Sequence, residues 1–303
     1  MATWDGGHAQ ADPPRMFRAR SGDTMPNMII PGMPPPAPRQ PDGILPPGTG
    51  WPAPPRRHRF RTLVRRTLAA LVTLVVLVGG GFGVLLLVTP SAGQAEALTQ
   101  AQLRSHGLGY PGPPVSARFA AALVATEDHR FYTDPGVDPI AVGRVALGYL
   151  RGHGSQQGGA TITQQLAKML YTPGRSSLAA EAEQITLAVK LNFTYSKPQI
   201  LAMYASVAYF GQGYYSLGAA SCGYFGVPPS GLTWPQAALL AGAVQAPSAY
   251  DPLSHPAQAK ARESHVLSRL AATGVLTRAQ ASAALAQSIQ LLPAGQGRPA
   301  GCG

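Results

Sequence analysis

The residues best placed for chemistry are a group of acids in the middle of the chain. Residues 67–303 contain nine Asp or Glu, and four of the nine lie between 127 and 138, where the chain reads EDHRFYTDPGVD. A carboxylate is the right group to take a proton from a hydroxyl that attacks a carbon atom. An adjacent acid pair at a helix end is also common as solvated charge, so Glu127 and Asp128 alone leave both interpretations open.

A second stretch, GGATITQQLAK at 158–168, is suited to binding phosphate. Two glycines open a helix whose first turn is rich in hydroxyl and amide side chains, and Lys168 follows two turns in. Free N–H groups at a helix N-terminus attract anions, and Gln and Lys side chains add donors. A capped polar surface helix is the alternative, but two Thr and two consecutive Gln on one short helix favour phosphate binding.

The elements that must position these side chains are predicted to be helices. Three of them begin with a hydroxyl residue and then a Pro in the first turn, at Ser196, Thr233 and Ser254, and Gly274 is expected to end the helix over 255–273. No segment shows convincing period-two alternation. The predicted helices span 117–128, 139–151, 161–171, 178–194, 197–209, 234–244, 255–273 and 278–289.

A membrane anchor precedes this helical domain. Residues 68–88 carry no charge over 21 positions, which is long enough to cross about 30 Å of hydrocarbon. Six Arg lie in 56–66, and the next basic residue after the apolar run is Arg104. The positive-inside rule therefore predicts a cytoplasmic N-terminus and an extracytoplasmic domain after Thr89. The run lies too far from the N-terminus for a cleaved signal peptide.

Composition sets the remaining boundaries. Fourteen of the 30 prolines fall in residues 1–55, which predicts a disordered tail. The predicted order is a disordered cytoplasmic tail (1–55), a basic juxtamembrane segment (56–67), a transmembrane helix (68–89), a catalytic domain (95–290) and a flexible tail (291–303). The net charge of +11 suits anionic lipid headgroups or a diphosphate, with nucleic acid as the other interpretation. Whether Cys222 and Cys302 form a disulfide is left open, and no Cys/His spacing resembles a zinc site.

Taken together, these segments resemble the family 51 glycosyltransferases, the peptidoglycan glycosyltransferase domain of class A penicillin-binding proteins and their monofunctional relatives. The first family motif is Glu-Asp-x-x-Phe-x-x-His-x-Gly, and the second is Gly-Gly-Ser-Thr-Ile-Thr-Gln-Gln-Leu-x-Lys-Asn. Further matches follow in order at 195–201, 209–211, 224–226, 237–242, 245–252, Arg262 and 266–267. The resemblance covers roughly residues 105–272.

The resemblance implies a lysozyme-like, mostly α fold that joins lipid II units into β-1,4-linked glycan with release of undecaprenyl diphosphate. It implies Glu127 as the general base and Glu183 as a second catalytic carboxylate. The expected substrate-binding residues are Asp128, Phe131, Gly159, Thr161, Gln164, Gln165, Lys168, Arg175 and Lys197. The implied partners are lipid II, the growing glycan strand, membrane lipids and other cell-wall synthesis proteins, without nucleic acid. No cofactor is implied, and a divalent cation is left open. The absence of a Ser-x-x-Lys motif predicts a monofunctional form.

The chain departs from the family pattern at several positions. Asp134 stands where the first motif has His, and Ala160 and Met169 replace a Ser and an Asn of the second. The Arg-Lys pair of the third motif, Arg-Lys-x-x-Glu, is lost, and its Glu falls on Glu183 or Gln184 according to the anchor used for counting. Ala202 and Ser206 replace the Glu and Asn of the fourth motif, Ile-Leu-Glu-x-Tyr-Leu-Asn.

Lys190 and Lys197 are the candidates to replace the lost charge. Besides an active polymerase, two functions stay open: a catalytically weakened relative that acts as a scaffold, and a lysozyme-like hydrolase. The hydrolase needs a pair of carboxylates that flank the bond.

Overall fold

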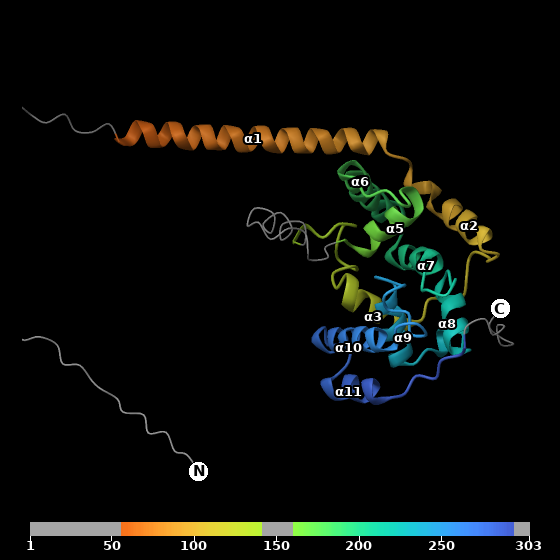
Figure 1. Cartoon of the computed structure of the whole chain (residues 1–303). Coiled ribbons are helices and arrows are strands. Elements are labelled where there is room, and N and C mark those ends of the chain that lie inside the picture. The colour runs from red at the N-terminus through yellow and green to blue at the C-terminus, as the bar shows by residue number, and fades with distance from the viewer. Residues whose placement is uncertain (1–55, 141–159, 294–303) are drawn as a thin grey trace, which may run out of the picture. The chain divides into compact units, whose positions relative to one another are not determined.

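The computed structural model describes residues 56–140 and 160–293, and these fold almost entirely as helices (Figure 1). Contacts divide the chain into a unit that ends at Arg59 and a second that begins at Phe60. In the described residues the only β pairing is an isolated bridge between Tyr209 and Tyr215. The prediction of a mostly α domain is therefore confirmed. In chain order the elements are α1 (Arg56–Val88), η1 (Ala92–Gln94), α2 (Ala95–Ser105), α3 (Ala117–Glu127), α5 (Ile162–Tyr171), α6 (Leu178–Thr194), α7 (Lys197–Val207), α8 (Leu217–Phe225), η2 (Pro229–Gly231), α9 (Trp234–Ala243), α10 (Pro256–Ala272) and α11 (Arg278–Ala286).

Seven of the eight predicted helices are present with boundaries within three residues, as α3, α5, α6, α7, α9, α10 and α11. The prediction for 139–151 lies outside the described residues except at 139 and 140. The sequence missed α2 and α8. Eight of the nine residues of α8 are buried, so this helix lacks the polar face that gives an amphipathic helix its recognisable period.

The helix starts were predicted correctly at two of three positions. Ser196 and Thr233 form capping boxes, in which their backbone N–H groups donate to the Oε1 atoms of Gln199 and Gln236, each at 2.9 Å. The third prediction was wrong: Ser254 does not cap α10. Its hydroxyl donates to Asp251 Oδ2 at 2.7 Å instead, and the N-cap is His255, without a side-chain bond. Gly274 does end α10, with a φ of +77°.

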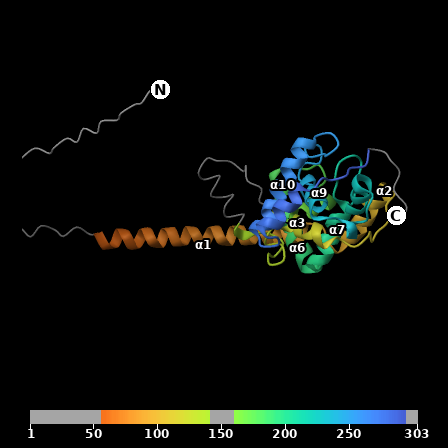
Figure 2. The same cartoon turned by 90° about the horizontal axis from the view of Figure 1, so that it is seen from below.

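The core centres on α9. Residues 237–243 of this helix are all buried, and their small side chains let α10 and α3 approach closely. In both views α3, α9 and α10 lie side by side (Figures 1 and 2). A second group is formed by α5, which packs against α6 and α7. One continuous hydrophobic cluster joins the two groups, so the motif on α3 and the motif on α5 face a common interior.

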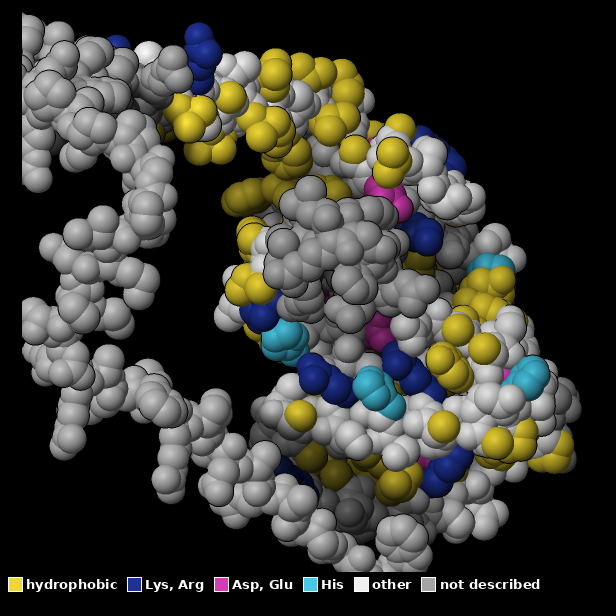
Figure 3. Space-filling model, turned by 60° about the vertical axis from the view of Figure 1, so that its left-hand side comes forward, with side chains coloured by type: hydrophobic (Ala, Val, Ile, Leu, Met, Phe, Trp, Pro, Cys, Tyr) yellow, Lys and Arg dark blue, Asp and Glu magenta, His cyan; other side chains and the backbone are white. Residues whose placement is uncertain are grey.

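The described residues contain one helix long and apolar enough to cross a membrane, over Phe60–Val88 of α1. Its most apolar 18-residue segment has a mean hydropathy of 2.7, and none of that segment is buried. Hydrophobic side chains lie along the helix in the space-filling view (Figure 3). The helix continues back to Arg56 through the basic segment, because that segment contains no helix-breaking residue and Arg is a good helix former. The predicted span at 68–89 overlaps this candidate span, which begins earlier, at Phe60, and ends at Val88.

Gly136 lies within the acidic stretch, against the backbone of α6. Its φ is +93°, and a Cβ atom there would lie 2.4 Å from the carbonyl oxygen of Ala188. Gly174 has a similar φ of +72° but nothing within 4 Å of the Cβ position. Substitution of Gly174 therefore introduces backbone strain alone, whereas substitution of Gly136 introduces both backbone strain and steric overlap.

We expect Gly136→Ala to lower the free energy of unfolding by about 2–5 kcal/mol, because strain and overlap with a rigid backbone add. Gly174→Ala should cost only about 1–2 kcal/mol. Denaturant unfolding of the two variants, followed by circular dichroism, measures the difference. Equal losses would show that the contact with Ala188 is unimportant.

Candidate active site

Glu127 is the last residue of α3, and two other helices hold its carboxylate. Arg262 of α10 donates from Nη2 to Oε1 at 2.8 Å, and Gln165 of α5 donates from Nε2 to Oε2 at 3.2 Å. The Glu127 and Arg262 side chains are only 11% and 13% exposed. In the space-filling view an acidic side chain lies recessed among basic and histidine side chains (Figure 3). A partly buried carboxylate at a helix C-terminus, where the dipole disfavours negative charge, requires such a partner.

A buried tyrosine fixes the orientation of Gln165. The hydroxyl of Tyr204 on α7 donates to Gln165 Oε1 at 2.9 Å, which leaves the Gln165 amide nitrogen to donate to Glu127. Burial raises the pKa of Tyr204 far above its ordinary value, and the charge of Glu127 adds to this shift. Tyr204 is therefore a permanent donor, and the hydrogen bonds run in one direction from Tyr204 through Gln165 to Glu127.

Arg262 is held in place by α9. Its Nε donates to the carbonyl of Gly242 at 3.3 Å, and its guanidinium carbon lies 5.6 Å from the centre of the Tyr250 ring. A Cβ atom at Gly242 would come within 2.7 Å of Arg262 Cγ, so the approach requires glycine. Two turns along α10, Arg269 donates to the carbonyl of Ala125 at 3.1 Å, which stabilises the end of α3.

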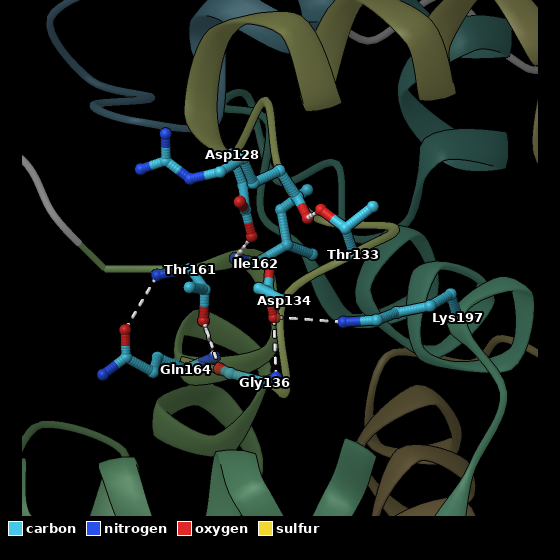
Figure 4. Close-up of polar contacts among 9 residues, drawn as sticks. Asp128, Thr133, Asp134, Gly136, Thr161, Ile162, Gln164 and Lys197 are labelled. Atoms are coloured by element: carbon cyan, nitrogen blue, oxygen red, sulfur yellow. Dashed lines mark hydrogen bonds and ion pairs between the residues drawn. The ribbon is translucent and has the colours of Figure 1, made fainter. Parts of the chain in front are cut away.

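Asp128 begins a separate buried network (Figure 4). Its Oδ2 accepts the backbone N–H of Ile162, the first residue of α5, at 3.1 Å. Asp134 Oδ1 accepts from the Gly136 N–H at 2.6 Å and from Lys197 Nζ at 3.1 Å. Burial, and then the charge of the neighbouring Asp134, raises the pKa of Asp128 to about 7. This network ties the acidic stretch to the start of α5.

Several residues expected to bind substrate have internal partners in the structure. Thr161 and Gln164 form the capping box of α5, and the Thr161 hydroxyl donates to the Gly136 carbonyl at 2.7 Å. Lys197 pairs with Asp134 and lies 4.7 Å from the centre of the buried Phe131 ring. The first turn of α5 is therefore capped by its own side chains, and Thr161 and Thr163 in it are buried.

The remaining predicted residues divide into three groups. Lys168 is exposed and has no ion-pair partner among the described residues. Arg175 Nη1 pairs with Glu183 Oε2 at 2.9 Å, whereas Gln184 donates to Thr172 Oγ1 at 2.8 Å. Gly159 lies outside the described residues.

The structure thus brings Glu127 together with Gln165, brings Asp128 together with Thr161 and Lys197, and leaves Glu183 in a pair with Arg175. Lys190 keeps its charge but is held beside the end of α1, because its Nζ donates to the carbonyls of Thr89 and Pro90 at 2.8 and 3.1 Å. Within residues 56–140 and 160–293, no group of three His, Cys, Asp or Glu could hold a metal ion.

Sequence reasoning missed Tyr204 and the contact of Arg262. Both residues lie inside stretches that match the family pattern, but their partners are 39 and 135 positions away in the chain. A pattern of spacing along one helix carries no information about contacts at such separations.

The class of this helical domain is defined by comparison with known proteins. Residues 101–271 match the family described as Transglycosylase. The chain belongs to this transglycosylase family.

Two relatives and one solved structure illustrate the likeness. The chain is 41% identical over 162 residues to penicillin-binding protein 1A of Streptococcus oralis, which covers 52% of this chain and 25% of the relative. It is 38% identical over 168 residues to penicillin-binding protein 1A of Neisseria flavescens, which covers 55% of this chain and 21% of the relative. The crystal structure of penicillin-binding protein 1A from Haemophilus influenzae matches 44% of this chain and 17% of that chain, with 25% identity and a TM-score of 0.31. The chain thus spans a quarter or less of the length of these relatives.

The raised pKa of Asp128 makes stability depend on pH. A group whose pKa is higher in the folded state, about 7 against 3.8, favours folding at low pH, and this contribution disappears as the pH rises through 7. We expect the free energy of unfolding to fall between pH 4 and 7 with a slope of up to about 1.4 kcal/mol per pH unit from this group. Urea unfolding at a series of pH values measures the slope. Asp128→Asn should remove that part of it, and an unchanged slope would contradict a neutral Asp128.

Proposed function

We propose that this protein is a peptidoglycan glycosyltransferase that polymerises lipid II into β-1,4-linked glycan strands and releases undecaprenyl diphosphate. The observation that carries the proposal is the Glu127 carboxylate, held at 2.8 Å by Arg262 and 3.2 Å by Gln165 in a chain of this family. Membership of the transglycosylase family and the penicillin-binding protein 1A relatives support the reaction class.

In the proposed reaction, the 4-hydroxyl of the acceptor sugar attacks the anomeric carbon of the donor. A new C–O bond forms as the bond to the diphosphate oxygen breaks, and the diphosphate leaves with the electron pair. Glu127 takes the hydroxyl proton. Each carboxylate oxygen of Glu127 accepts one hydrogen bond from the protein and keeps a second lone pair for the acceptor. Arg262 and Gln165 hold the base in a fixed orientation, which lowers the entropic barrier.

Positive charge for the leaving diphosphate would come from Lys168 and Arg175. Lys168 is exposed on α5, and the Arg175 side chain is 52% exposed although it pairs with Glu183. Lys190 and Lys197, the candidates to replace the lost Arg-Lys pair, are held by internal partners. We therefore expect a polymerase that is slower than relatives with the complete third motif. Glycan hydrolysis is disfavoured, because the adjacent acid Asp128 is buried and bound to Ile162.

The catalytic role of Glu127 is tested by Glu127→Gln, which keeps the shape and a hydrogen bond but cannot accept a proton. We expect polymerisation of labelled lipid II to fall by about 10²–10⁴-fold. Glu181→Gln, at an exposed position on α6, should leave the rate unchanged. A near wild-type rate for a folded Glu127→Gln would exclude this residue as the base.

Glu183→Gln tests whether the ion pair between Glu183 and Arg175 contributes to polymerisation. A loss of activity in this variant would support Glu183 as the carboxylate of the third motif. A wild-type chain that binds lipid II without polymerising it would instead support the scaffold function.

Lys168→Ala tests the proposed diphosphate contact. If one charge-assisted hydrogen bond is lost, binding of undecaprenyl diphosphate should weaken by about 1–3 kcal/mol. Stability should change little, because Lys168 is solvated. Arg278→Ala removes the same charge from an exposed position on α11 and is the matched control. If both variants bind equally well, Lys168 does not contact the diphosphate.

We also propose that α1 crosses the membrane with the N-terminus in the cytoplasm, so that the domain from about residue 95 acts outside. The asymmetry of basic residues supports this orientation, with six Arg in 56–66 and none between 67 and 103. Protease added to intact spheroplasts should digest the domain and leave a membrane-protected fragment that contains the N-terminal tail. Protection of the domain with loss of the tail would reverse the orientation.

A further inference from the structure

One side of α6 carries an apolar stripe opposite the face that packs on the core. Five apolar residues recur at a spacing of three or four, which places them within an arc of about 80° at 3.6 residues per turn. They are Leu178, Ala182, Ile185, Val189 and Phe193. The two ends of the stripe are open to solvent, with Leu178 84% exposed and Phe193 82% exposed. None of the five belongs to the hydrophobic cluster of the described residues, so the stripe is not part of the core.

Two hydrogen bonds hold the C-terminal end of this stripe next to the end of α1. Lys190 Nζ donates to the carbonyls of Thr89 and Pro90 at 2.8 and 3.1 Å. These two residues directly follow the apolar span of α1, which ends at Val88. Phe193 lies only about 4.5 Å beyond Lys190 along the helix axis, at 1.5 Å per residue. The stripe therefore reaches within one helical turn of the point where the apolar span ends.

The N-terminal end of the stripe coincides with a departure from the family pattern. The Arg-Lys pair of the third motif falls in the first turn of α6, where this chain reads LAAE at 178–181. Two cations there would be costly to place in hydrocarbon, whereas Leu and Ala are not. The charged residues Glu181 and Lys190 lie to either side of the stripe by helical spacing, as in helices that lie in a membrane interface.

We propose that α6 lies along the outer surface of the membrane, with its apolar stripe inserted among the phospholipids that surround the end of α1. The inference rests on the membrane-spanning role proposed for α1. Lipid is the occupant of the stripe because the Lys190 contacts fix it where α1 leaves the bilayer. A helix of this kind buries its apolar face about 5–10 Å below the headgroups. Arg175, three residues before Leu178, then lies at the level of the lipid phosphates, where a lipid-linked diphosphate is held.

Fluorescence quenching by brominated lipids tests the contact. The full-length chain is reconstituted into vesicles of phosphatidylcholine and phosphatidylglycerol whose acyl chains carry bromine either near the headgroup or near the chain end. We expect the emission added by Phe193→Trp to be lost with the shallow bromine, because the ring lies about 5–10 Å below the headgroups. Val275→Trp, at a 45% exposed position beyond α10 and away from α6 (Figures 1 and 2), should keep its emission. Subtraction of the wild-type spectrum removes the emission of the three native Trp.

Leu77→Trp, within α1, separates failure of the α6 contact from failure of the membrane span. Loss of its emission with the deep bromine, while Phe193→Trp keeps its emission with both lipids, would overturn the proposal and leave the span intact. Unquenched emission at both positions would overturn the proposal together with the span. If Phe193→Trp emission shifts to the blue without quenching, protein such as a second copy of this chain covers the stripe, and the proposal is wrong. None of these measurements depends on polymerisation of lipid II.

Two further tryptophans test whether the whole stripe faces the lipid. Leu178→Trp, at the other end of α6, should lose its emission with the shallow bromine as Phe193→Trp does. Ala179→Trp lies about 100° further round the helix at an exposed position, so it should lose less. Equal quenching at 178 and 179, or none at 178, would overturn the insertion of this face along the length of the helix.

Discussion

The interaction on which the site depends is the ion pair between Glu127 and Arg262. Glu127 ends α3, where the helix dipole opposes a negative charge, and its side chain is almost covered by neighbouring elements. A carboxylate in that position stays ionised only when a cation and further donors replace the lost water. Arg262 supplies the cation and Gln165 supplies the donor. The packing of α9 against α3 and α10 makes this pair possible, because the small residues of α9 let α10 approach closely enough to bring Arg262 to the end of α3.

The neighbouring acids Asp128 and Asp134 are also buried, but their negative charge is compensated differently. Asp128 lies one residue further along but has no cation of its own, and its pKa rises to about 7 through burial and the charge of Asp134. Asp134 is balanced by Lys197 and by the N–H of Gly136. Burial therefore favours the protonated form of Asp128, while Lys197 binds Asp134 and Arg262 binds Glu127. The two adjacent acids, Glu127 and Asp128, thus lie in different electrostatic surroundings.

The sequence predicted most of the helices, since a capping hydroxyl, a Pro in the first turn and a periodic apolar face are local signals. It failed at α8, which is buried all round and so has no periodic pattern, and at Ser254, where the hydroxyl bonds to Asp251 instead of the helix. The acidic stretch and the polar helix at 162–171 were located correctly for the same local reason. Their partners could not be located, because Arg262 and Tyr204 act across 135 and 39 residues of intervening chain.

The difference between local signals and contacts distant in the chain also explains why the departures from the family pattern could not be interpreted from sequence. Counting along the third motif left Glu183 and Gln184 equivalent, but the fold turns Glu183 toward Arg175 and Gln184 toward Thr172. Sequence also left Lys190 and Lys197 available to replace two missing charges. In the fold, Lys190 bonds to the carbonyls that follow α1, and Lys197 neutralises Asp134. Because Asp134 stands where the family has His, the substitution there adds a negative charge that Lys197 must balance. The loss of the Arg-Lys pair and the change at 134 therefore act in the same direction, since each reduces the positive charge left for the proposed diphosphate contact.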